Sequence, residues 1–82
     1  MTSNVKFGEL RQLLLELGFR EAASTEQTAF RHAVSDILFV FRPYRAGDLV
    51  ADYNLAEVQA MLDARGLMSA EAFDSQFRKT PA

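Results

Sequence analysis

Apolar positions recur with helical spacing near the start of the chain. Four leucines follow the i, i+3, i+4, i+7 spacing that places side chains on one face of a helix, namely Leu10, Leu13, Leu14 and Leu17. Phe7 stands one turn earlier, and Gly18 occupies a position where a left-handed residue commonly ends a helix. This pattern predicts a helix over residues 7–17.

Three short extended segments follow the predicted helix, and polar turns separate them. The first two span residues 19–23 and 28–32, and the polar stretch 24–27 between them suits a hairpin turn. The third spans residues 37–41 and consists of β-branched, aliphatic and aromatic residues in a run too short for a typical helix. Because short connections join successive strands, we expect an antiparallel meander.

The third predicted strand is apolar on both of its faces. Ile37, Phe39 and Phe41 share one face, whereas Leu38 and Val40 share the other. Helices on one side of the sheet cover only the first set. Either a C-terminal helix therefore wraps around to the second face, or another chain covers that face. Leu38 and Val40 are accordingly candidates for contact with a protein partner or with a second copy of the chain.

The C-terminal half predicts a loop and two further helices. Residues 42–53 form the loop, and Asn54 followed by Glu57 resembles a capping box, so the second helix is expected to begin there. Gly66 marks its expected end. A last short helix is expected to follow a cap at Ser69 and to run through residue 78.

These segments predict one α+β domain over residues 1–82: a helix, a three-stranded antiparallel meander, a helix and a short C-terminal helix. The chain has no cysteine and a single histidine, which excludes a disulfide framework and a multi-histidine metal site, and we expect no cofactor. No apolar run has the length of a membrane span, and no secretory signal begins the sequence, so we expect a cytoplasmic protein.

Several short motifs occur in this order along residues 7–67. They are Phe7-Gly8-Glu9-Leu10, Gly18-Phe19, Phe30-Arg31-His32, Gly47-Asp48-Leu49 and Gly66-Leu67. In order and spacing they resemble the HicA family of mRNA interferase toxins, whose fold is related to double-stranded-RNA-binding domains. The resemblance implies a helix, three strands and a helix as a common core, with residues 69–78 as an addition. It also implies a role in a toxin–antitoxin system, in which the toxin cleaves RNA.

The sequence departs from that family at its implied catalytic residue. HicA-like toxins carry a Gly-Ser-His triplet where the second strand begins. In the register set by Phe30-Arg31-His32, that triplet falls on Thr25-Glu26-Gln27. A glutamine cannot exchange a proton near neutral pH, so Gln27 cannot serve as general acid or base. The resemblance therefore implies a relative that does not cleave RNA.

His32 is the remaining residue type suited to proton transfer near neutral pH. One interpretation makes it a displaced catalytic base. The other makes it a strand residue beside Phe30 that is half-buried or hydrogen-bonded. No neighbour in the sequence supplies an orienting partner, which favours the second interpretation.

The segment Arg42-Pro43-Tyr44-Arg45 also has two interpretations. Two guanidinium groups around a tyrosine could bind phosphate and stack a base, and Arg31 could extend such a patch across the sheet. Alternatively, Tyr44 packs on the core while the arginines pair with nearby acids, Asp48 or Asp52. The formal net charge of -2 opposes nucleic-acid binding and favours the structural interpretation.

The function that these observations favour is that of a non-catalytic module that binds a protein partner or a second copy. One alternative is an RNA-binding regulator. The other is an active endoribonuclease toxin that uses His32 or Gln27, with Arg31, Arg42 and Arg45 supplying charge for phosphate. The closest acidic pair in the predicted loop, Asp48 and Asp52, lacks the further oxygen ligands of a metal site, so we expect no bound metal.

Overall fold

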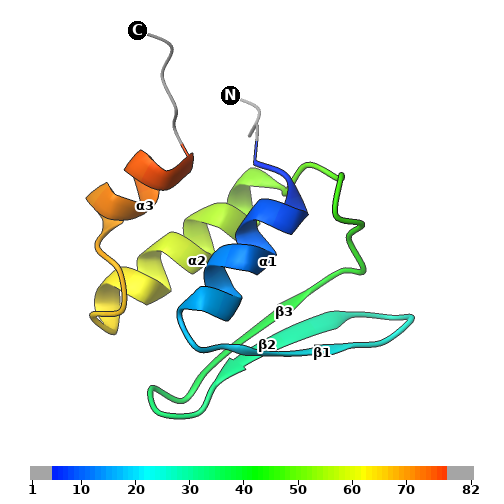
Figure 1. Cartoon of the computed structure of the whole chain (residues 1–82), viewed down its shortest axis with the longest axis horizontal. Helices are drawn as coiled ribbons and strands as arrows, with labels where there is room; N and C mark the ends of the chain where they lie inside the picture. The colour runs from blue at the N-terminus through cyan, green and yellow to red at the C-terminus, as the bar shows by residue number, and fades with distance from the viewer. Residues whose placement is uncertain (1–4, 78–82) are drawn as a thin grey trace, which may run out of the picture.

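A computed structural model of the chain describes residues 5–77. Three helices and three strands occur in the order α1, β1, β2, β3, α2, α3 (Figure 1). Their bounds are Phe7–Glu16, Arg20–Ala23, Thr28–His32, Ile37–Phe41, Asp52–Ala64 and Ala70–Phe77. The predicted α+β layout is confirmed.

The first helix begins without a side-chain cap. Its N-cap residue, Lys6, makes no such hydrogen bond, and the loop before α2 supplies backbone acceptors instead. The N–H of Phe7 donates to the carbonyl of Asp48 at 2.8 Å, and the N–H of Gly8 donates to that of Ala46 at 2.9 Å. Two of the N–H groups that every helix leaves unpaired at its start are thus satisfied by residues distant in the sequence.

Both predicted helix-ending glycines adopt left-handed backbone conformations. Gly18 has φ of 99° and Gly66 has φ of 71°. After α1, the N–H of Gly18 donates to the carbonyl of Leu15 and that of Phe19 to Leu14, the paired bonds of a Schellman motif. The first helix therefore ends at Glu16, one residue before the predicted boundary.

The sheet is an antiparallel meander with strand order β1-β2-β3. Ala23 pairs with Thr28 around the first turn, and His32 pairs with Ile37 around the second. In the first turn, the Ser24 side chain accepts the N–H of Gln27 at 3.2 Å. Phe19 was predicted to start β1 but instead lies just before it, buried in the core.

The second helix begins three residues earlier than predicted, since its N-cap is residue 51 instead of residue 54. Asp52 is its first residue and Ala51 its N-cap, so Asn54 lies inside the first turn rather than at the cap. The Asn54 side chain is buried and its Oδ1 accepts a hydrogen bond from the Tyr44 hydroxyl. A tertiary contact therefore explains the asparagine that resembled a cap.

The third helix follows the predicted cap. The Ser69 hydroxyl accepts the N–H of Ala72 at 3.1 Å, as an N-cap side chain should. Gln59 of α2 joins the two helices, because its amide donates to the Ala70 carbonyl at 2.9 Å and to the Asp74 carboxylate at 3.1 Å. Residue 78, the predicted end of α3, lies outside the described residues.

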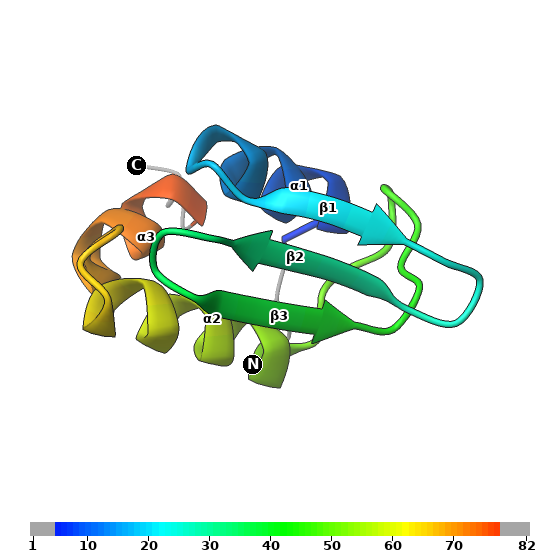
Figure 2. The same cartoon turned by 90° about the horizontal axis from the view of Figure 1, so that it is seen from below.

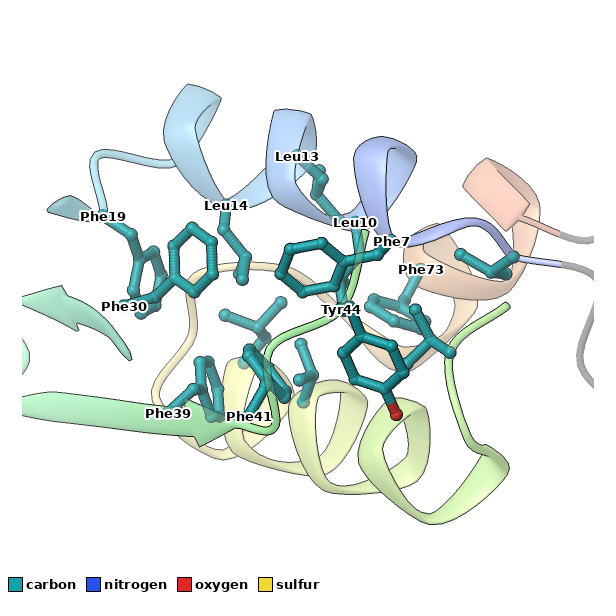
Figure 3. Packing of buried hydrophobic residues seen from close by; sticks show 14 of the residues in the cluster. Phe7, Leu10, Leu13, Leu14, Phe19, Phe30, Phe39, Phe41, Tyr44 and Phe73 are labelled. Atoms are coloured by element: carbon teal, nitrogen blue, oxygen red, sulfur yellow. The ribbon is translucent and has the colours of Figure 1, made fainter. Parts of the chain in front are cut away.

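A single apolar cluster fills the space between the helices and one face of the sheet (Figure 3). Phe30, Phe39 and Phe41 project into it from β2 and β3, and Leu10 and Leu14 meet them from α1. All three helices lie on this side of the sheet (Figures 1 and 2). Since α3 packs against α2, it does not wrap around to the second face of the sheet.

Candidate functional site

The face of the sheet turned away from the helices is uncovered in the described part of the chain (Figure 2). We call it the outer face, and six residues form it: Arg20, Ala22, Ala29, Arg31, Leu38 and Val40. Strand pairing arranges them in two rows. One row runs Arg20, Arg31, Leu38, and the other runs Ala22, Ala29, Val40.

The apolar part of the outer face is as the strand alternation predicted. The Leu38 side chain is 61% exposed and that of Val40 is 45% exposed, whereas Ile37, Phe39 and Phe41 on the same strand are buried. Ala22 and Ala29 extend the Val40 row with small side chains that do not screen it. The result is an aliphatic surface that a partner can contact without any rearrangement of the sheet.

The charged part of the outer face contains two arginines directly opposite each other. Arg20 of β1 pairs with Arg31 of β2, and both side chains are exposed. Like charges in directly opposed positions destabilise a sheet. The ion pair found among residues 5–77, between Arg11 and Glu21 at 2.7 Å, involves neither of them. Within residues 5–77, the two positive charges beside the aliphatic surface thus have no neutralising group.

A shallow depression of about 260 Å³ lies against these arginines, and Gly18 and Ala33 complete its lining. Arg20 was not among the residues singled out from the sequence. The hairpin turn could have revealed it, because a turn over residues 24–27 pairs residue 23 with residue 28. Counting back along both strands places Arg20 opposite Arg31.

Tyr44 is unavailable for stacking on a base, which corrects its assignment as a nucleic-acid-binding candidate. Its ring is buried and stacks on Phe7 with centroids 5.1 Å apart. Its hydroxyl points toward the start of α2, where it donates to Asn54 Oδ1 at 2.8 Å and accepts the Ala51 N–H at 3.1 Å (Figure 3). The structural interpretation of Tyr44, packing on the core, is confirmed.

The two arginines that flank Tyr44 remain exposed but do not pair with the loop acids as expected. The Arg42 guanidinium carbon lies over the Tyr44 ring, 4.5 Å from its centroid. At Arg45 the backbone N–H, not the guanidinium group, donates to the Asp48 carboxylate at 2.8 Å. Within residues 5–77 neither guanidinium group forms an ion pair, so the predicted pairing with Asp48 or Asp52 was wrong.

His32 has a structural environment. Its Nδ1 accepts the backbone N–H of Ser35 at 3.2 Å, and its ring lies 5.0 Å from that of Phe19 between centroids. Gln27, which the resemblance to HicA toxins would equate with their catalytic histidine, is exposed in the hairpin turn before β2. His32 ends the same strand, so the structure does not bring the two residues to one site.

The helical side of the molecule carries the opposite charge. Helices α2 and α3 contain five acidic residues and no basic ones: Asp52, Glu57, Asp63, Glu71 and Asp74. Over residues 5–77, no three histidine, aspartate or glutamate side chains lie where they could hold a metal ion together. None of the described helices combines the length and the apolar character needed to cross a membrane.

The chain matches no protein-family model, and no curated protein or solved structure matches it. The resemblance to HicA toxins therefore stays a prediction.

Proposed function

We propose that this chain is a non-catalytic protein-binding module whose outer face takes a partner segment that combines carboxylates with aliphatic side chains. The observation that carries the proposal is the exposure of Leu38 and Val40 on an uncovered sheet face, beside the opposed pair Arg20 and Arg31. Carboxylates of a partner would neutralise the two guanidinium groups, and its aliphatic groups would cover Leu38 and Val40.

The kinds of side chain on the outer face favour a protein over RNA. Proteins that bind single-stranded nucleic acid stack bases on exposed aromatic rings. The outer face has none, because Phe30, Phe39 and Phe41 point into the core. Tyr53 is the exposed large aromatic residue of the described chain, and it belongs to α2, on the other side of the sheet. The acidic helices would also repel a phosphate backbone.

The size of the site predicts a weak and reversible interaction. Full burial of a leucine or valine side chain contributes about 1.5–3 kcal/mol, and both residues are already about half covered. Each would therefore add roughly 1 kcal/mol on binding. Charge-assisted hydrogen bonds to Arg20 and Arg31 add to this, while loss of translational and rotational freedom opposes it. We expect rapid exchange with the partner and affinity that decreases at high salt.

The test uses nuclear magnetic resonance titrations of the isotope-labelled chain with three probes. The first is a synthetic peptide of alternating glutamate and leucine, the second replaces glutamate by lysine, and the third is a single-stranded RNA. We expect the acidic peptide alone to shift the methyl signals of Leu38 and Val40 and the Nε–H signals of Arg20 and Arg31. A gel of the RNA sample reports cleavage at the same time.

Matched variants distinguish specific binding at the outer face from non-specific binding to exposed apolar residues. Arg31→Glu and Leu38→Ser should each reduce binding of the acidic peptide, whereas Val34→Ser should not. Val34 is a suitable control because its side chain is 93% exposed but lies in the turn between β2 and β3. Absence of outer-face shifts at millimolar peptide would overturn the proposal. So would salt-sensitive RNA binding that Arg31→Glu abolishes, and RNA cleavage would restore the toxin reading.

A further inference from the structure

The edge of the sheet at β3 is a second surface that pairs with no further strand in the described part of the chain. Strand β3 lies at the edge of the sheet and pairs on one side, with β2. Within residues 5–77, no backbone hydrogen bond joins Ile37–Phe41 to any other element. Half of the strand's backbone N–H and C=O groups therefore face outward along this edge, available to another strand.

The two edges of the sheet differ in how they are protected. Strand β1, at the other edge, is short and carries charged residues, and Glu21 is tied to Arg11 of α1. Strand β3 has five consecutive apolar residues and neither a charge, a proline nor a bulge within it. Proteins normally block exposed edges with such features. Of the two edge strands, only β3 lacks such protective features, which indicates that this edge pairs with another strand.

The sequence around β3 is self-complementary in antiparallel register. A two-fold axis through Phe39 places Leu38 of one copy opposite Val40 of the second copy, and the reverse. Counted along the chain, the same register brings Asp36, the left-handed residue of the turn just before the strand, near Arg42 of the second copy. Each interface thus has two opposite-charge pairs at its ends and aliphatic pairs between them, and such cross-strand pairs stabilise antiparallel sheets.

The end residues of this register are available for those contacts. Asp36 and Arg42 are both exposed. Arg42 lies over the Tyr44 ring, but its guanidinium group donates no hydrogen bond within residues 5–77 and remains able to bind a carboxylate. The charges therefore specify both the direction and the register of the pairing.

We propose that two copies of this chain associate through their β3 edges, in an antiparallel register centred on Phe39, to form one continuous six-stranded sheet. The assembly brings two outer faces together as a single surface with Leu38 and Val40 of both copies at its centre. This inference concerns the edge of the sheet and stands apart from the acidic partner proposed for its outer face.

Analytical ultracentrifugation of the full chain over a range of concentrations tests the proposal. We expect a monomer–dimer equilibrium. Arg42→Asp and Asp36→Lys each place like charges at both ends of the interface, so each should weaken dimerisation by about tenfold or more. A mixture of the two variants should dimerise again, because every like-charge pair then becomes an opposite-charge pair. Recovery in the mixture cannot result from damage to either fold.

Two further variants complete the design. Asp36 has φ of 54°, a conformation that asparagine adopts readily, so Asp36→Asn removes the charge without backbone strain and should also weaken the dimer. Glu26→Arg, at the exposed tip of the first hairpin, should leave it unchanged. A monomer at millimolar concentration would overturn the proposal, as would a dimer indifferent to both charge reversals or a mixture that stays monomeric. The peptide titration remains informative in each case.

Discussion

The buried hydroxyl group of Tyr44 allows a sharp test of what fixes α2 to the loop before it. Tyr44→Phe keeps the ring and its stacking on Phe7 but removes two hydrogen bonds, one to Asn54 and one from Ala51. Both of these residues belong to the beginning of α2. The variant should therefore unfold more easily while its fold and the outer face stay the same.

The structure sets the size of the effect. Each hydrogen bond contributes about 1 kcal/mol to stability, and a buried polar atom left unpaired costs about 1–3 kcal/mol. Asn54 is only 8% exposed, so its Oδ1 would be left without a hydrogen-bond donor at a position that water does not reach. The N–H of Ala51 is less buried and can turn to solvent. We expect a decrease of about 2–3 kcal/mol in the free energy of unfolding.

Urea denaturation followed by circular dichroism measures this decrease. With a urea m-value of about 1 kcal/mol/M, the midpoint should fall by about 2–3 M. Tyr53→Phe is the matched control, because Tyr53 is 72% exposed, and it should change stability by less than about 0.5 kcal/mol. In a double-mutant cycle, Tyr44→Phe and Asn54→Ala should be strongly non-additive. Equal stability of Tyr44→Phe and the unchanged chain would refute this account of the buried pair.

Three further substitutions test separate features of the fold. Gly18→Ala should lower the free energy of unfolding by about 1–2 kcal/mol in thermal denaturation, because φ at this position is 99°. The control Gly47→Ala should be nearly neutral, since a β-carbon there meets no atom within 4 Å. Ser69→Ala should cost about 1 kcal/mol and accelerate hydrogen exchange in the first turn of α3, and unchanged exchange would contradict its role as a cap. Arg20→Gln should stabilise the chain slightly at low salt by relieving repulsion from Arg31, and the gain should vanish in 1 M salt.

Local patterns were sufficient to predict most of the fold. The apolar stripe of α1, the alternation in β3 and the two glycines that end helices are properties of neighbouring residues, so periodicity and backbone conformation determine them. The uncovered outer face also followed from alternation, through the exposure of Leu38 and Val40. Ser69 was recognisable as a cap because its acceptor role requires only the next turn of helix.

The errors arose where distant residues determine the outcome. Asn54 has the residue type of a cap, but Tyr44 holds its side chain and α2 begins earlier. The aromatic ring of Tyr44 could have been exposed or buried, and its tertiary packing, on Phe7 among others, decides this. The opposition of Arg20 and Arg31 required the hairpin register, which a turn without an Asn-Gly or Asp-Gly signal specifies weakly.

The backbone cap of α1 has a consequence for the order in which the protein is made and folds. The carbonyls of Ala46 and Asp48 that complete its first turn are synthesised only after the whole sheet. The helix therefore leaves the ribosome before the carbonyls that cap its N-terminus have been synthesised. Its first turn gains these two hydrogen bonds only once the loop is present. Gly8 allows the loop to approach the start of α1 closely, because a β-carbon at this position would lie 3.2 Å from the Ala46 carbonyl oxygen. A ribosome-stalled chain whose residues 46–48 are still inside the exit tunnel should show a frayed start of α1, and a longer stalled chain that exposes those residues should order it.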